Sequence, residues 1–188
     1  YYYEGELQSS GEDSSSGWPM VYVSTCDLDI ADVVIDTAQH QAVYASEATV
    51  DIEDLTVKHT GTEGETSEPA VELLWTSAVP DLWLEKLQVT GAEGGAALSV
   101  RDVIRDETGS VELRGLEIGL DDGLGAAGVG GPGVEIEGIT GMVLLGLDIA
   151  GTDGAAIDLT DTSGTITGVD PMDPDMGGTI SAPATSGV

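Results

Sequence analysis

The chain has 188 residues, of which 35 are Asp or Glu and only 5 are Lys or Arg, and its formal net charge is −30. This charge argues against nucleic acids and anionic membranes as partners, because phosphate groups are bound by clusters of Lys and Arg. The longest apolar run, near residues 141–146, falls far short of the roughly 18–20 residues that span a membrane, so we expect no membrane insertion.

The chain divides into three parts. Residues 1–19, with Tyr1 to Tyr3 and Trp18, form an N-terminal tail or cap, residues 20–169 carry a repeat, and residues 170–188 form a C-terminal acidic turn and extension. The chain begins Tyr-Tyr-Tyr-Glu, without Met or the charged and apolar regions of a signal peptide. We therefore expect a processed protein or a fragment.

The repeat contains an eight-residue pattern with apolar residues at its first, third, sixth and eighth places. Such alternation predicts β-strands, in which alternate side chains face a core and the solvent. A weaker sixth copy ends at Val169. The five copies that share one frame are Leu28–Ile35, Val50–Val57, Leu82–Val89, Val111–Ile118 and Met142–Ile149.

A shorter apolar-x-apolar strand precedes each copy. These short strands are Val21–Val23, Val43–Ala45, Val71–Leu73, Leu98–Val100, Val134–Ile136 and Ile157–Leu159. Their first residues are separated by 22, 28, 27, 36 and 23 residues. We expect the extra residues of the longer coils to lie in one place, after the eight-residue pattern.

A two-residue gap inside the pattern breaks the alternation once per coil, which predicts a corner. Each coil would then have about three short strands and three turns, and each strand would lie parallel to its copy in the next coil, at about 4.8 Å. The second residue of the gap is Asp32, Asp54, Lys86, Gly115, Gly146 and Gly168. The outward side chains form columns: Tyr44-Glu72-Ser99-Glu135-Asp158, Ala31-Glu53-Glu85-Arg114-Leu145-Thr167 and Val34-Thr56-Gln88-Glu117-Asp148.

These features predict an all-β fold, a single-stranded parallel β-helix of about six coils. A βαβ array would need helical periodicity between the strands, and a leucine-rich repeat would need an Asn or Cys at a fixed place. An antiparallel sandwich would not repeat one motif in a single frame. Since parallel crossovers are nearly always right-handed, we expect a right-handed winding.

Coils of at least 22 residues, short strand triplets and insertions at one corner resemble the right-handed parallel β-helix superfamily. This superfamily includes pectate lyases, polygalacturonases, phage tailspikes and autotransporter-type adhesin passengers. The resemblance covers about residues 20–169. It implies the fold and leaves the function open, because one fold hosts many functions.

One candidate site is the sequence Asp170-Pro-Met-Asp173-Pro-Asp175-Met-Gly-Gly. Its alternate acids followed by Gly resemble part of a calcium loop, although the downstream Glu of an EF-hand is lacking. The segment is therefore either a Ca²⁺ site or a plain acidic turn.

A second candidate site, for carbohydrate, contains Trp83, Glu85 and Arg114. The alternation predicts that Trp83 points outward, where it could stack on a sugar ring together with Trp75 or pack under the loop 58–69. Glu85 and Arg114 are neighbours in one column, so they form either an acid–base pair or a salt bridge between coils. For an enzyme, the resemblance implies clustered Asp with His, or calcium-binding acids with an Arg or Lys base.

The histidines and the single cysteine add no catalytic set. His40 and His59 stand in turns without an obvious Asp motif beside them. Cys26 is either a small, partly buried apolar residue or a thiol that bridges to another chain, and an internal disulfide is impossible.

We therefore expect an extracellular or cell-surface module with a structural, adhesive or filament-forming role and an acidic surface that could bind cations. The alternative is a polysaccharide-active enzyme or carbohydrate-binding module of the pectate-lyase-like type. Enzymatic activity is left open, and no catalytic residue is assigned. Self-association through the ends of the β-helix is a further expectation, because unpaired strand edges add strands.

Overall fold

A computed structural model describes residues 2–8, 19–60, 68–77, 81–103, 110–119, 128–167 and 179–180, and these residues contain strands without helices. The strands form two parallel sheets, and successive strands alternate between them. Sheet B contains β2 (Val21–Ser24), β4 (Val43–Ser46), β6 (Val71–Trp75), β8 (Leu98–Asp102), β10 (Val134–Glu137) and β12 (Ile157–Thr160). Sheet A contains β1 (Tyr2–Gln8), β3 (Leu28–Ala38), β5 (Val50–Thr60), β7 (Leu82–Ala92), β9 (Val111–Ile118), β11 (Thr140–Ile149) and β13 (Ser163–Thr167), with β14 (Thr179–Ile180) beside β11.

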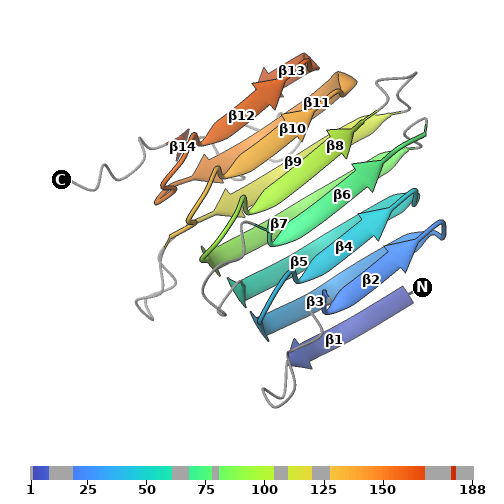
Figure 1. The fold of residues 1–188 in the computed structure, drawn as a ribbon, viewed down its shortest axis with the longest axis vertical. Helices are drawn as coiled ribbons and strands as arrows, with labels where there is room; N and C mark the ends of the chain where they lie inside the picture. The colour runs from blue at the N-terminus through green and yellow to red at the C-terminus, as the bar shows by residue number, and fades with distance from the viewer. Residues whose placement is uncertain are drawn as a thin grey trace.

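One short strand followed by one long strand makes a coil, and the coils run from β2–β3 to β12–β13. They stack along the long axis of the molecule, with β1 at one end and β12 and β13 at the other (Figure 1). The predicted all-β parallel β-helix of about six coils is therefore confirmed. Its right-handed winding stays a prediction.

The coils are stacked without a shift in register through the central strands, so equivalent residues lie directly beside one another. Ile30 lies beside Ile52 and Ile52 beside Leu84, for example. Each pair of neighbours within the three predicted outward columns is also paired in the sheets. The frame read from the sequence is thus the frame of the structure.

The corner inside the eight-residue pattern is a left-handed backbone conformation at one residue per coil. Its φ is 53° at Asp32, 59° at Asp54, 57° at Lys86, 60° at Gly115 and 62° at Gly146. Sheet pairing continues on both sides of this residue, so β3, β5 and β7 are single bent strands of 11 residues rather than two short strands each. An L-residue in this conformation costs roughly 1–2 kcal/mol, which glycine avoids in the fourth and fifth coils.

The extra residues of the longer coils lie at two corners, so the expectation of a single place is wrong. Residues 61–70 and 119–133 follow long strands, as predicted. Residues 76–81 and 103–110, however, join short strands to long ones. The apolar anchors used to measure coil length cannot separate these two places, because both lie between the same pair of anchors.

The core between the two sheets holds one side chain per inward position, and nearly all of these side chains are apolar. On sheet B, Ala45, Leu73, Val100 and Ile136 are fully buried, and on sheet A the inward residues of β5, β7, β9 and β11 are equally covered. The last coil differs, since Leu159 is 40% exposed and Ile166 is 43% exposed. Each inward residue is therefore covered mainly by its equivalents in the coils above and below.

The N-terminal segment adds a strand to the stack. β1, which lies inside the predicted tail or cap of residues 1–19, pairs in parallel with β3 and extends sheet A by one strand beyond β2 of sheet B. Most of the predicted C-terminal extension, residues 170–188, lies outside the described residues.

Two glycines with positive φ test how tightly the coils are stacked. A Cβ at Gly119 (φ +67°) would lie 1.9 Å from the carbonyl oxygen of Ala150 in the next coil, whereas a Cβ at Gly141 (φ +73°) meets no atom within 4 Å. We expect Gly141→Ala to lower the free energy of unfolding by about 1 kcal/mol through backbone strain alone. Gly119→Ala should cost about 2–4 kcal/mol, because overpacking is added. Chemical denaturation measures both, and equal losses would contradict the stacking described here.

Candidate functional site

An aromatic and charged cluster lies on the outer face of sheet A, at β7 and β9. Trp83 points outward and is 36% exposed. The guanidinium carbon of Arg114 lies 5.0 Å from the centroid of the Trp83 ring, which is a cation–π arrangement. Arg114 also forms an ion pair with Glu112, the register neighbour of Trp83. We call Trp83, Glu112 and Arg114 the Trp83 cluster.

Of the three residues proposed for carbohydrate, the structure brings Trp83 and Arg114 together and places Glu85 beside Arg114. Glu85 is the register neighbour of Arg114, as the predicted column requires. The carboxylate that holds Arg114 over Trp83 is that of Glu112, two residues away on the same strand face. Period-2 alternation could have identified Glu112, since residues i and i+2 share a face of a strand. An acid–base pair or salt bridge between Glu85 and Arg114 stays a prediction.

A groove of about 330 Å³ lies beside this cluster, at the bend of sheet A. Its lining includes the corner residues of three successive coils, which are Asp54, Lys86 and the glycine at 115. Gln88 and Glu117 are both in the lining, and the amide of Gln88 donates a hydrogen bond to Glu117 at 3.1 Å. We call it the Gly115 groove, and its lining residues are Asp54, Thr56, Lys86, Leu87, Gln88, Gly115 and Glu117.

Trp75 does not belong to this site, which corrects the expectation that it stacks on sugar rings. It is fully buried at the end of β6, and its indole nitrogen donates a hydrogen bond of 3.0 Å to the carbonyl oxygen of Ala48. The alternation of Val71 and Leu73 continues to Trp75 and turns its ring inward. The predicted short strand was two residues too short to show this.

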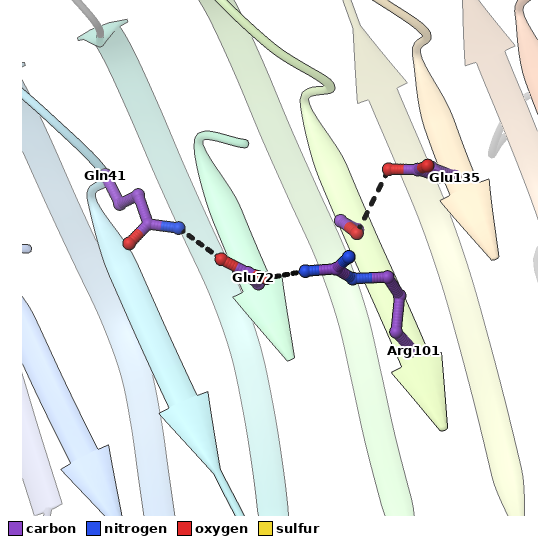
Figure 2. Close-up of polar contacts among 5 residues, drawn as sticks. Gln41, Glu72, Arg101 and Glu135 are labelled. Carbon is purple, nitrogen blue, oxygen red and sulfur yellow. Dashed lines mark hydrogen bonds and ion pairs between the residues drawn. The ribbon is translucent and has the colours of Figure 1, made fainter. Parts of the chain in front are cut away.

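A polar network lies on the outer face of sheet B and joins three coils. Figure 2 shows the carboxylate of Glu72 between Gln41 and Arg101. The amide of Gln41 donates to Glu72 at 2.6 Å, and Arg101 forms an ion pair with its other oxygen. Although burial lowers it, the pKa of Arg101 is raised overall by the hydrogen bond and charge of Glu72. Because Glu72 is buried and both its carboxylate oxygens have partners, this network links three adjacent coils. We call Gln41, Glu72 and Arg101 the clasp.

Two stacked tyrosines precede Glu72 in the same outward column. The rings of Tyr22 and Tyr44 lie 5.5 Å apart and nearly parallel. Burial, together with the nearby charge of Glu72, raises the pKa of Tyr44. The stack and the clasp therefore form one continuous strip over the first four strands of sheet B.

The histidines have carboxylate partners that the sequence did not reveal. His59 lies 3.0 Å from Asp36, one coil away, and His40 lies 3.4 Å from Glu68. The hydrogen bond with His59 lowers the pKa of Asp36. Both partners are distant in sequence, so only the stacking of coils brings them together.

Cys26 is exposed, in the turn between β2 and β3. The interpretation as a partly buried apolar residue is therefore wrong, whereas a bridge to another chain stays a prediction.

The candidate calcium ligands Asp170, Asp173 and Asp175 lie outside the described residues. Within the part of the chain that the structure describes, no three His, Cys, Asp or Glu side chains are grouped so that they could hold a metal ion.

Comparison of the chain with protein-family models, with curated proteins and with solved structures finds no match. None of the described segments forms a helix long and apolar enough to cross a membrane.

The clasp predicts a stability effect at Arg101. Arg101→Met leaves the buried carboxylate of Glu72 without its counter-charge, so we expect the free energy of unfolding to fall by about 2 kcal/mol. Lys86→Met removes an equal charge from an exposed position and should change it by less than about 0.5 kcal/mol. Urea unfolding measures the free energy of unfolding of both variants. Similar losses in the two variants would show that the clasp does not stabilise the stack.

The lowered pKa of Asp36 predicts a pH effect. The contribution of Asp36 to stability is present above its unfolded pKa of about 3.9 and is lost as the pH falls through the lower folded pKa. Asp36→Asn should therefore be less stable than the unmodified chain at neutral pH, and the difference should shrink in acid. Asp158→Asn, an equal charge change on an exposed residue, is the control for the melting series. A difference that does not vary with pH would rule out this linkage.

Proposed function

We propose that this chain is an extracellular or cell-surface β-helix module with a structural, adhesive or filament-forming role. The observation that carries the proposal is the direct stacking of like charges on an otherwise regular rod. Asp29 lies beside Asp51, and Glu53 lies beside Glu85, in adjacent coils. Like charges opposite one another destabilise a sheet, and salt screens them. Such a rod is suited to surroundings rich in cations.

The shape of the molecule supports the same proposal. The coils repeat in register from β2 to β12, and the repeated frame gives a scaffold with long outward columns. The resemblance to right-handed β-helices, whose members include adhesin passengers and phage tailspikes, is part of this proposal. The exposed apolar residues Leu159 and Ile166 of the last coil favour association through that end.

The charge columns predict a salt-dependent stability. Raising NaCl from 0.01 M to 1 M shortens the screening length from about 30 Å to about 3 Å, so the melting temperature should rise by about 5 °C or more. The double variant Asp51→Asn with Glu85→Gln should show a smaller rise, because it removes one carboxylate from each stacked pair. A melting temperature that does not change with NaCl concentration would contradict the role of the acidic columns.

Calcium is tested in the same experiment. If Asp170, Asp173 and Asp175 hold Ca²⁺, millimolar CaCl₂ should raise the melting temperature beyond NaCl of equal ionic strength. A chelator should reverse this rise, and Asp173→Asn should abolish it. Equal melting temperatures in the two salts would rule out the calcium site.

Electron microscopy of the purified chain at high salt tests the filament role, and monodisperse particles under all conditions would count against it.

A second function, polysaccharide binding or cleavage, is favoured by the Trp83 cluster. An exposed indole held in place by Arg114 and Glu112 is the kind of surface on which a sugar ring stacks. Trp83→Ala should weaken polysaccharide binding at least about tenfold, whereas Tyr22→Ala, which removes an exposed aromatic from sheet B, should leave it unchanged. Isothermal titration measures binding, and release of unsaturated or reducing ends distinguishes an enzyme from a binding module. Equal binding by both variants would exclude Trp83 as the platform.

A further inference from the structure

The Gly115 groove and the Trp83 cluster both include residues of β7, on either side of Glu85. Lys86, the first groove residue on this strand, follows Trp83 by three residues. By the rise of a strand, that separation is about 10 Å. A ligand that stacks on Trp83 and also enters the groove must therefore be an extended chain of several units rather than a single small ring.

The lining of the groove offers hydrogen-bond donors and acceptors side by side. Lys86 and Thr56 can donate, and Asp54 and Glu117 accept. The hydrogen bond from Gln88 fixes the orientation of Glu117. Hydroxyl groups suit such a lining, because each hydroxyl both donates and accepts.

The charge around the groove selects against an acidic ligand. Two carboxylates, Asp54 and Glu117, line the groove against the single ammonium of Lys86. Arg114 of the Trp83 cluster already forms an ion pair with Glu112. On a chain of net charge −30, a ligand with a carboxylate at every unit would be repelled.

From these three observations we infer that the Gly115 groove is a subsite for one neutral sugar unit of a polysaccharide that also stacks on Trp83. The inference rests on the proposed polysaccharide-binding function and names its ligand class. It adds the corner residues of three coils to the site and makes the glycine at 115 the determinant of access.

The structure supplies a matched pair of variants for the test. Lysine already occupies the equivalent corner of the preceding coil with nearly the same backbone φ, so Gly115→Lys places a long side chain at the groove in a backbone conformation that lysine adopts in this fold. Gly146→Lys makes the same change one coil further along, outside the groove lining. Melting temperatures of the two variants should be similar, which separates blocking of the groove from loss of fold.

Binding of the unmodified chain and of the three variants is measured by titration with neutral glucans, mannans and galactans, and with polygalacturonate and alginate. We expect a neutral polysaccharide to bind, and Gly115→Lys and Trp83→Ala each to weaken it at least about tenfold. Gly146→Lys should bind as the unmodified chain does.

The other outcomes separate the inference from the function on which it rests. Loss of binding in Trp83→Ala with full binding in Gly115→Lys would overturn the groove subsite and leave polysaccharide binding at Trp83 intact. Tighter binding of the acidic polysaccharides than of the neutral ones would overturn the ligand class. Binding of no polysaccharide by the unmodified chain would overturn both proposals.

Discussion

The stacking of each coil directly on the next is the constraint from which the other features follow. A residue at one place in the frame has its equivalents as neighbours on both sides, as with Ile30, Ile52 and Leu84. Inward positions are therefore mainly apolar, although Asp102 is buried beside Trp75, and one side chain per position is enough because the neighbouring coils complete its burial. The last coil shows the cost of lacking a neighbour, since Leu159 is exposed where its equivalents are covered.

The same constraint builds the outer surface and its candidate site. A change of residue at one position alters a single step of a column and leaves the backbone unchanged. Glycine at 115, between Lys86 and Gly146 in the corner column, replaces a long side chain in this way and lines the groove. Trp83 replaces Asp51 in the neighbouring column and turns an acidic row into an aromatic platform. The candidate site is therefore a local exception to a regular surface.

The sequence predicted the features that depend on the backbone frame. The alternation and the two-residue gap determined the outward columns and the corner at Asp32 and Asp54, because side-chain direction in a strand has a strict period. Features that depend on the choice of partner could not be predicted in this way. His59 pairs with Asp36 of another coil, and Arg114 pairs with Glu112 on its own strand, because side-chain conformation, which the period of the strand does not fix, decides the partner. Trp75 was misplaced because the apolar Leu74 before it hides the alternation that continues from Leu73 to Trp75.

The direct register of adjacent coils is tested most directly by cysteine pairing in a chain whose Cys26 is replaced by Ser. Thr56 and Gln88 are register neighbours, so their Cα atoms lie about 5 Å apart, within the range that a disulfide bridges. Glu117 lies one coil beyond Gln88, about 10 Å from Thr56 and outside that range. Under mild oxidation, the Thr56→Cys/Gln88→Cys chain should form an intramolecular disulfide, whereas the Thr56→Cys/Glu117→Cys chain should stay reduced. A disulfide in the second chain and none in the first would contradict the register on which this account depends.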